Sequence, residues 1–459
     1  MRANIAAELL YIGIDVGGTK IQASLVRESG DVVARKRVST PRTGGASKVI
    51  AAVERLIDAL MREEKATTDD VLAIGIAVPG VVDPETGRVV ITPNMSLTGS
   101  MVGPRLESRY DLPVAMGNDC NLGALGENWL GAARGAGSAF GIFVGTGIGG
   151  GFVRDNKLWC GYRQQAGEIG HMTMQLGGPK CACGNLGCLE ALASRTAIER
   201  RIREAVRAGR KTVLTKLLGG NLKIIRSGAI KEALARRDRL VTKVLGEASS
   251  VLGSACVSVF HVLDPEVIVL GGGVVEACGD FMLPIVQEVV RTHQLPAARE
   301  GGGVFLSALG DDAVVLGAVA QARMLVGRSP FKKKYASTPE YAAVKVTSGG
   351  EIAVGGKVSH SDVIIRVSGK VRPRQQEHVK ELYGTSHRIG TEEVAGVCLG
   401  GPEVLFIGTG KSARRELTAE AANYLRRRAM EVHVLPTARA VEMYNRCARR
   451  KSALLERVG

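Results

Sequence analysis

Two glycine-rich turns, each between two apolar strands, place the strongest constraint on how this chain folds. The first strand, Leu9–Asp15, runs into the turn Val16–Lys20, and the chain returns as a second apolar run. About 130 residues later, the strand Phe140–Val144 runs into Gly145–Gly151 and the chain returns again. A strand–turn–strand unit that occurs twice at this separation predicts a duplicated α/β architecture of two lobes.

The composition of these turns suits the binding of phosphate groups. Glycine lets backbone N–H groups approach phosphate oxygens, Thr19 and Lys20 add donors, and Asp15 can hold Mg²⁺ directly or through water. The spacing matches neither a Walker loop nor G-x-G-x-x-G. A single Gly-Gly hairpin would be structural in most proteins, but a third apolar strand, Val267–Leu270, also ends in glycines, Gly271–Gly273. Three such loops predict a nucleotide-binding site.

A polar pair at the end of another strand predicts the acceptor side of this site. The strand Leu112–Gly117 ends in Asn118 and Asp119, and a helical pattern follows over Asn121–Leu130. A carboxylate in this position can take the proton from an attacking sugar alcohol, while the amide beside it binds a hydroxyl. The alternative is a helix N-cap, which Asn and Asp commonly form. The phosphate loops favour the catalytic interpretation.

Four residues with metal-ligand chemistry form what we call the metal knot: His171, Cys181, Cys183 and Cys188. Three thiolates and one imidazole complete the tetrahedral coordination of zinc and leave no position for a reacting water, so the pattern predicts a structural metal. The alternative is a set of unrelated buried cysteines with a core histidine, which the C-x-C spacing disfavours. Glu168 and Glu190 flank the knot, so a rigid zinc loop would hold two carboxylates beside one pocket.

The bulk composition is that of an ordinary soluble globular protein. It contains 45% apolar and 23% charged residues, and 459 residues are enough for two or three domains. Outside the metal knot the cysteines show no paired framework, and no signal peptide is apparent, which predicts a reducing cytoplasm. The uncharged stretch Gly135–Val153 contains eight glycines, so we predict no transmembrane segment.

The positive charge of the chain is spread unevenly. The net charge is +16, and from Arg328 onward 24 Lys and Arg face 13 Asp and Glu, so the tail is a compositionally distinct unit. A basic balance is found in proteins with anionic partners such as nucleic acid. We interpret it here as a solvated basic face and do not expect nucleic-acid binding.

Together these motifs resemble the ROK family and, within it, the bacterial glucokinases. The resemblance rests on Asp15–Lys20, Asn118–Asn121, Gly145–Gly151, Gly167–His171 and Cys181–Glu190, and it covers roughly residues 9–327. It implies an α/β fold of two actin/hexokinase-like ATPase lobes, with ATP, Mg²⁺ and a structural Zn²⁺ as cofactors and Asp119 as general base. The expected sugar-binding residues are Gly80, Asn94, Asn118, Asp119, Glu168, His171 and Glu190. The expected ATP and Mg²⁺ site comprises Asp15, Gly17, Gly18, Thr19, Lys20, Thr146, Gly147, Gly271 and Gly272.

Two positions depart from the family pattern. Cys120 follows the expected base where the family often has alanine, and it is small enough to pack in that space. No tryptophan follows Asn94 within Met95–Ser100, where the family tends to carry one, which bears on the identity of the sugar more than on the reaction class. We also expect His171 to serve twice, with one ring nitrogen on zinc and the other toward a sugar hydroxyl.

A linker and a change of pattern predict a separate C-terminal domain. The linker contains Pro330 and a charge run and shows no periodicity. Beyond it, a strand before Thr409, a helix at Thr418–Ala429, a strand at Val432–Leu435 and a helix capped by Thr437 predict a small α/β sandwich. The motifs that resemble the Mth938-like family are Ile407–Gly410, Thr437–Ala440 and Tyr444–Asn445, within about residues 340–459. That resemblance implies a fold and no assigned chemistry.

The resulting prediction is an ATP-dependent hexose kinase joined to a small α/β domain. We expect a kinase at 1–327, with lobes of roughly 9–120 plus the last helix 311–327 and of 121–310, then a linker at 328–342 and a domain at 343–459. Glucose is the expected hexose and a homodimer the expected assembly. The alternatives are a sugar-sensing regulator and a scaffold that acts through the basic C-terminal domain. Only eight residues precede Leu9, which would leave no room for a helix-turn-helix, and the joint presence of Asp15, Asp119 and Glu168 argues for an enzyme.

Overall fold

The computed structural model describes residues 9–93, 95–293, 295, 303–331, 340–374, 380, 385, 388–398, 402–411, 416–426 and 431–458. The chain forms two compact units, each described by itself. Unit 1 comprises Met1–Leu325 with Ser329–Phe331, and unit 2 comprises Val326–Arg328 with Lys332–Gly459. The linker expected at 328–342 stays a prediction, because residues 332–339 lie outside the described part of the chain.

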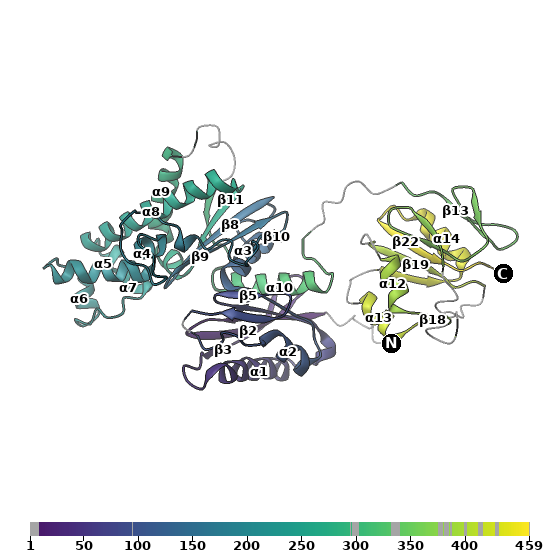
Figure 1. Ribbon diagram of the computed structural model, residues 1–459, viewed down its shortest axis with the longest axis horizontal. Coiled ribbons are helices and arrows are strands. Elements are labelled where there is room, and N and C mark those ends of the chain that lie inside the picture. Colours follow the sequence, from purple (N-terminus) through teal and green to yellow (C-terminus); the bar gives the residue numbers. More distant parts are fainter. Residues whose placement is uncertain are drawn as a thin grey trace. The chain divides into compact units, whose positions relative to one another are not determined.

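The first lobe of unit 1 is a five-stranded sheet with helices on both faces. Its elements are β1 (Leu10–Val16), β2 (Lys20–Arg27), β3 (Val32–Ser39), α1 (Gly45–Glu63), η1 (Thr68–Asp70), β4 (Val71–Val78), the hairpin β5 (Val81–Asp83) and β6 (Arg88–Ile91), α2 (Val102–Tyr110), β7 (Val114–Asn118) and, later in the chain, η4 (Gly310–Asp312) and α10 (Ala313–Leu325). The strand order is β3-β2-β1-β4-β7. Figure 1 shows α1 and α2 on one face and α10 on the other, which explains why β4 is buried at every position.

The second lobe repeats this arrangement. Its elements are α3 (Asp119–Leu130), β8 (Ser138–Val144), β9 (Ile148–Arg154), β10 (Lys157–Leu158), η2 (Ile169–His171), α4 (Leu189–Ala193), α5 (Arg195–Arg207), α6 (Val213–Leu217), α7 (Ser227–Ala235), α8 (Arg239–Leu263), β11 (Val267–Gly271), α9 (Gly273–His293) and β12 (Gly303–Leu306). The strand order is β10-β9-β8-β11-β12, with β8 antiparallel to β9 and parallel to β11, as β1 is to β2 and β4. The predicted duplication of two α/β lobes is therefore confirmed.

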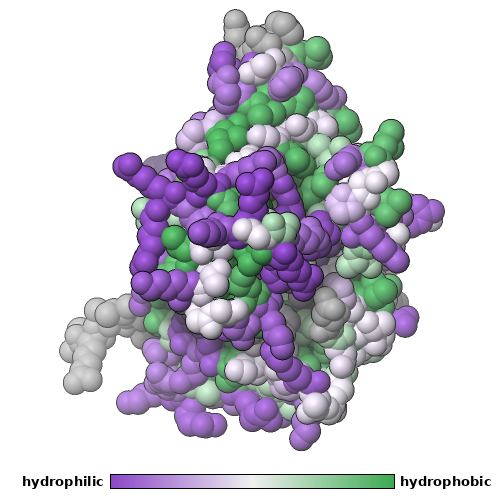
Figure 2. All heavy atoms as spheres, turned by 90° about the vertical axis from the view of Figure 1, so that its left-hand side faces the viewer, coloured by the Kyte–Doolittle hydropathy of each residue, from purple (hydrophilic) through white to green (hydrophobic). Residues whose placement is uncertain are grey.

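The helices of the second lobe combine a buried core with a solvated side. By length and apolar composition, α8 is the one helix among the described residues that could cross a membrane, but 56% of its most apolar stretch is buried inside the fold, as in a core helix. On α5, Ala197, Ile198 and Ile202 are buried, whereas its arginines lie toward solvent or in ion pairs. Hydrophilic side chains cover much of the side of unit 1 that carries α5, α6 and α7 (Figure 2).

The backbones of helices α3 and α10 lie in direct contact, and glycine makes this contact possible. A Cβ on Gly126 of α3 would lie 2.1 Å from the carbonyl oxygen of Ala313, and a Cβ on Gly317 of α10 would lie 1.7 Å from that of Leu122. Helix α10 contacts the first sheet in the same way, because a Cβ on Gly75 of β4 would lie 2.0 Å from a carbonyl oxygen of α10. No larger residue fits at these positions without a shift of a helix.

A buried carboxylate connects α3 to the segment that precedes α10. Glu127 is fully buried, and its carboxylate accepts hydrogen bonds from Ser307 Oγ at 2.6 Å and from the backbone N–H groups of Ala132 at 2.8 Å, Leu309 at 3.0 Å and Ala308 at 3.2 Å. A buried charge without such donors would be very unfavourable. The donors therefore fix where the chain enters α10 relative to α3.

Unit 2 is a smaller α/β structure around a five-stranded sheet. Its strands are β13 (Val344–Val346), β14 (Ile352–Val354), β15 (Lys357–Ser359), β16 (Val363–Ile365), β17 (Val371–Pro373), β18 (Arg388–Ile389), β19 (Val404–Gly408), β20 (Glu416–Leu417), β21 (Glu431–Leu435) and β22 (Lys451–Leu455), and its helices are α12 (Thr391–Val397), α13 (Ala419–Arg426) and α14 (Thr437–Arg446). The main sheet has the order β17-β16-β22-β19-β21. The predicted order of strand, helix, strand and helix corresponds to β19, α13, β21 and α14, and the predicted end of the first helix at Ala429 lies outside the described residues.

Strand β22, in the centre of this sheet, was not predicted. It begins with Lys451 and Ser452, which are polar residues, yet all five of its residues are buried. The ammonium of Lys451 donates to the carbonyl oxygens of Tyr444 and Cys447, both at 2.6 Å, and lies 4.8 Å from the ring centroid of Tyr341. These contacts satisfy a buried lysine, and none of them is visible in a local sequence pattern.

The contact between α3 and α10 predicts a clear difference between two glycine substitutions. Gly317→Ala is expected to lower the free energy of unfolding by about 1–3 kcal/mol, because the new methyl group overlaps the carbonyl of Leu122. The matched control is Gly228→Ala in α7, where an added Cβ meets nothing within 4 Å. That change is expected to be neutral or to stabilise the helix by about 0.5–1 kcal/mol. Calorimetric melting of the full chain measures both, and equal stability of the two variants would contradict the packing argument.

Candidate active site

Two carboxylates lie together at one edge of the first sheet. Asp15 is near the end of β1, and Asp119 begins α3 directly after β7. Both strands run parallel to β4, so they end at the same edge. Burial and then the neighbouring Asp119 raise the pKa of Asp15 to about 7, and burial also raises the pKa of Asp119.

Further acidic groups approach from the second lobe. Partial desolvation raises the pKa of the Glu168 carboxyl, His171 lowers it, and Asp119 and Glu190 raise it. These effects require Asp119, His171 and Glu190 each to lie near Glu168. The structure therefore brings together four of the predicted sugar-site residues, which come from the start of α3, the segment before η2, η2 itself and α4.

The turn between β8 and β9 is held in place by residues that follow the metal knot. Arg195 Nη2 donates to Thr146 Oγ1 at 2.7 Å, and Thr196 Oγ1 donates to the carbonyl oxygen of Thr146 at 2.8 Å. Glu190 Oε2 accepts from the backbone N–H of Ile148 at 3.0 Å, and a Cβ on Gly147 would lie 2.2 Å from the same oxygen. Arg195 and Thr196 were not predicted, because they lie about 50 residues from Thr146 in the sequence.

The other two glycine loops meet the same region. Gly272, after β11, has a φ of +85°, and a Cβ there would lie 2.7 Å from the backbone nitrogen of Val144 at the end of β8. At Gly18, in the turn between β1 and β2, an added Cβ meets nothing within 4 Å, so this turn faces open space. Burial and then Asp311 raise the pKa of Glu276, in the first turn of α9, and Lys20 lowers it. The first and third loops therefore lie near each other. Open backbone turns near one another suit a polyphosphate.

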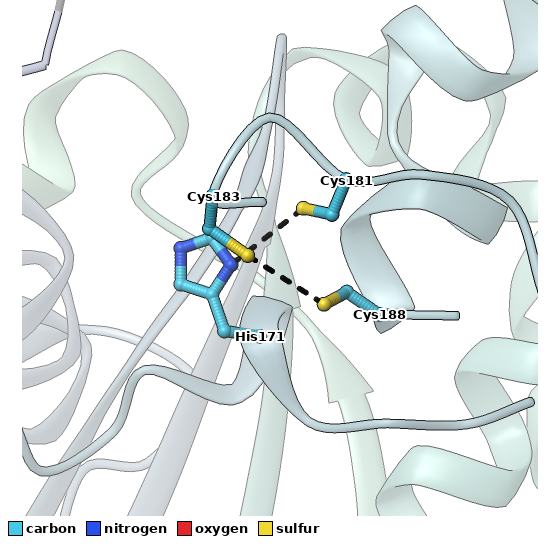
Figure 3. Close-up of side chains that lie close together, drawn as sticks. All are labelled: His171, Cys181, Cys183 and Cys188. Carbon is cyan, nitrogen blue, oxygen red and sulfur yellow. Dashed lines mark hydrogen bonds between the residues drawn. The ribbon is translucent and has the colours of Figure 1, made fainter. Parts of the chain in front are cut away.

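The metal knot has the geometry of a tetrahedral site. The ligand atoms of His171, Cys181, Cys183 and Cys188 all lie within 4.8 Å of one another (Figure 3). Cys181 Sγ lies 3.8 Å from His171 Nδ1, and Cys183 Sγ lies 3.8 Å from Cys188 Sγ. Two sulfur ligands at about 2.3 Å from a zinc ion are roughly 3.8 Å apart in a tetrahedron, so the donor set fits zinc.

The orientation of the His171 ring matters for the sugar side. Its Nδ1 faces the sulfur atoms, and Figure 3 shows the second ring nitrogen turned away from them. The same segment places Glu168 three residues before the ligand. A metal on Nδ1 would fix the tautomer and leave Nε2 for another partner.

Comparison with known proteins identifies the family. The model described as "ROK family" matches residues 11–324 of this chain. The chain belongs to the ROK family. A second family model, described as "Protein of unknown function (DUF498/DUF598)", matches residues 344–455. This is the family of the Mth938-like proteins, so the predicted C-terminal resemblance is confirmed.

Three ROK proteins illustrate the range of the similarity. The glucokinase of Halalkalibacterium halodurans is 32% identical over 308 residues, which cover 67% of this chain and 93% of the relative. The xylose repressor of Caldicellulosiruptor bescii is 29% identical over 309 residues, which cover 67% of this chain and 77% of the relative. The solved structure of a ROK family glucokinase from Streptomyces griseus, in complex with glucose and AMPPNP, matches with a TM-score of 0.59 and 30% identity and covers 69% of this chain and 99% of that one. The kinase relatives support a sugar kinase with the two-lobe ATPase fold.

Several predicted ROK site residues also have structural roles. Asn118 is the N-cap of α3, because its Oδ1 accepts from the backbone N–H of Asn121 at 3.0 Å, so the alternative considered for it is correct. Its Nδ2 donates to the carbonyl oxygen of Gly80 at 3.0 Å. Gly80 has a φ of +91°, and a Cβ there would lie 2.2 Å from the carbonyl oxygen of Ile91. Asn94 lies outside the described residues, and a sugar contact by any of these residues stays a prediction.

On the nucleotide side, Lys20 already has a partner. Its ammonium pairs with Asp311 Oδ2 at 3.1 Å, and Arg37 pairs with the same oxygen at 3.0 Å. Thr19 is exposed, and its carbonyl oxygen accepts from the backbone N–H of Thr40. Asp311 and Glu276 were not predicted, because no motif marks them. A contact between Lys20 and a phosphate stays a prediction. It requires the Lys20 ammonium either to leave Asp311 or to contact Asp311 and the phosphate together.

Removal of zinc is expected to abolish sugar binding before nucleotide binding, because only the sugar side uses the ring of His171. Cys183→Ser tests this with little risk to the fold, since Cys183 is exposed. The control is Cys447→Ser in unit 2, which is expected to retain the metal because Cys447 is not one of the four ligands. Metal analysis is expected to find about one zinc per chain in the parent protein. Calorimetric titration with glucose and with AMPPNP measures the two affinities, and a zinc-free preparation with unchanged glucose affinity would contradict the coupling.

The raised pKa of Asp15 predicts a dependence of stability on pH. The folded state favours the protonated carboxyl, so its contribution to the free energy of unfolding is full below pH 3.8 and is lost as the pH rises to about 7. Asp15→Asn is therefore expected to stabilise the protein by about 2–4 kcal/mol at pH 8, without Mg²⁺ or nucleotide, and by less than half of that at pH 5.

Melting of the parent protein, of Asp15→Asn and of the surface control Asp155→Asn at both pH values measures this effect. A difference between the parent and Asp15→Asn that does not change with pH would contradict the assignment. An equal change of stability with pH in Asp155→Asn would also contradict it, because the side chain of Asp155 is exposed.

Proposed function

We propose that unit 1 transfers the γ-phosphoryl group of ATP to a hydroxyl of a hexose, with glucose as the preferred acceptor and glucose 6-phosphate as the product. The observation that supports this most is the position of Asp119. Its carboxylate begins α3, is desolvated, and lies near the carboxylates of Asp15 and Glu168. A base of raised pKa beside an open phosphate site suits proton transfer near neutral pH.

In the proposed reaction, Asp119 accepts the proton of the attacking hydroxyl. The hydroxyl oxygen forms a bond to the γ-phosphorus, the bond to the bridging oxygen breaks, and ADP leaves. Mg²⁺, held by Asp15 directly or through water, would supply charge neutralisation on the phosphates. The backbone N–H groups of Gly17, Gly18 and the turn at Thr146–Gly147 would bind the phosphate oxygens.

The sugar would be held by residues that the metal knot orders. Glu168 lies near Asp119, His171 and Glu190, since all three affect the pKa of its carboxyl, and carboxylates are strong acceptors for sugar hydroxyls. Glu190 also binds the N–H of Ile148 in the β8–β9 turn, so it connects the sugar side with the phosphate side. Fixed geometry of this kind supplies much of the acceleration in phosphoryl transfer.

A sugar-sensing regulator is the second candidate, because xylose repressors are among the relatives at 29% identity. A regulator would bind sugar without turnover, whereas the proposed kinase would release ADP. The desolvated Asp119 beside Asp15 favours the kinase, since binding alone does not require a base of raised pKa. The role of unit 2 and the homodimer stay predictions, and activity of a chain that ends at residue 327 would show whether unit 2 affects catalysis.

Substitution of the base gives the decisive test of this function. Asp119→Asn is expected to lower kcat by about 10²–10⁴ and to leave AMPPNP binding unchanged, because the amide keeps the shape but cannot accept the proton. Coupled ADP release with glucose, mannose, fructose and N-acetylmannosamine measures turnover and selectivity. The matched control is Asp111→Asn at the C-cap of α2, which is expected to keep full activity. Turnover by Asp119→Asn at the parent rate would refute the assignment.

A further inference from the structure

A cavity of about 490 Å³ lies between the two lobes of unit 1, beside the proposed sugar site. One wall is the β5–β6 hairpin and the other is the segment 162–165. The residues that line it are Val81, Asp83, Glu85, Val90, Ile91, Tyr162, Arg163, Gln164 and Gln165. None of them belongs to the predicted sugar, nucleotide or metal sites, and the volume lies within the range of about 300–1,000 Å³ typical of small-molecule sites.

Both walls of the cavity continue directly into the proposed sugar site. Val81 follows Gly80, whose carbonyl oxygen is bonded to Asn118 at 3.0 Å, next to Asp119. On the other wall, Gln165 precedes Glu168 by three residues. The cavity therefore begins one residue from Gly80 on one wall and three residues from Glu168 on the other, so a group attached to a sugar bound near Asp119 would be directed toward it.

The chemistry of the lining matches a sugar ring or an aromatic group. The side chain of Tyr162 is 95% exposed, and the guanidinium of Arg163 lies 5.5 Å from its ring centroid. Gln164 and Gln165 each offer an amide donor and a carbonyl acceptor, and Glu85 offers a carboxylate. On the opposite wall, Ile91 is 54% exposed. Aromatic and aliphatic side chains beside several hydrogen-bonding groups are a lining that suits a small polar ligand with an apolar face.

We propose that this cavity is an outer acceptor subsite, which holds a second sugar ring or an aromatic aglycone joined to the hexose that is phosphorylated. The inference rests on the proposed function and extends its substrate class from free hexoses to their glycosides. The phosphoryl group would move from ATP to a hydroxyl of the inner ring, and Asp119 would take the proton of that hydroxyl. The glycosidic bond stays intact, since no group of the cavity takes part in the transfer.

The test compares glucose with extended acceptors on one enzyme. Cellobiose, maltose and the two p-nitrophenyl glucosides of opposite anomeric configuration are assayed beside glucose by ADP release. We expect at least one extended acceptor to be phosphorylated. Tyr162→Ala is expected to lower kcat/KM for that acceptor about three- to tenfold while leaving glucose unchanged, and Tyr162→Phe is expected to retain the parent value. Because Tyr162 is almost fully exposed, its replacement is not expected to disturb folding.

The control variant is Val262→Ala, an exposed position on α8 that does not line the cavity. If no glycoside is phosphorylated and none competes with glucose, the inference fails while the proposed function stands. An equal loss for glucose and glycosides in Tyr162→Ala also overturns it, because Tyr162 would then serve the inner ring. If no hexose is phosphorylated, the proposed function fails, and calorimetric binding of a glycoside that depends on Tyr162 would still support the subsite.

Discussion

The close packing of α3 is the contact on which the rest of unit 1 depends. Its first residue is Asp119, so any displacement of the helix moves the proposed base. The helix touches α10 through Gly126 and Gly317 and touches β9 at Gly151, where a Cβ would lie 2.7 Å from the Cα of Asn121. Side chains at these positions would separate α3 from both neighbours. Since packed interiors do not deform continuously, the proposed site depends on glycines that never contact a substrate.

The glycine run at 145–151 has two structural roles that the sequence pattern does not separate. The pattern predicts a phosphate loop, which stays a prediction, and the structure places Gly145–Gly147 in the turn between β8 and β9, where Thr146 is exposed. Gly149 and Gly151, however, belong to β9 and make room for the start of α3, since a Cβ on Gly149 would lie 2.4 Å from Cys120 Sγ. Composition alone cannot separate glycine that exposes backbone to a ligand from glycine that lets a helix approach.

The duplicated sheets, the cluster of metal-ligating side chains and the place of Asp119 at a strand end could be predicted, because residues close in sequence encode each of them. They are a strand with its turn, three cysteines with a nearby histidine, and an acid after a strand. The catalytic role of Asp119 stays a prediction. Glu127, Arg195 and Lys451 could not be predicted, because their roles depend on partners brought near by folding. Arg195 contacts Thr146 across 49 residues, and Glu127 contacts Ser307 across 180. Without these contacts each would be interpreted as an ordinary solvated charge.

Acidic side chains gather in the proposed site, and this gives the metal knot and the ligands a common role. Besides burial, Asp119 raises the pKa of the Asp15 carboxyl, Asp119 and Glu190 raise the pKa of the Glu168 carboxyl, and His171 lowers the pKa of Glu168. Sugar hydroxyls would donate hydrogen bonds to these carboxylates, and Mg²⁺ would neutralise Asp15, so each ligand would relieve part of the repulsion. A site of this kind is less stable alone than an uncharged one and gains stability when it binds. The rigid knot would hold the acids in place in the absence of ligand, which is a reason for a structural metal beside a site whose charges repel.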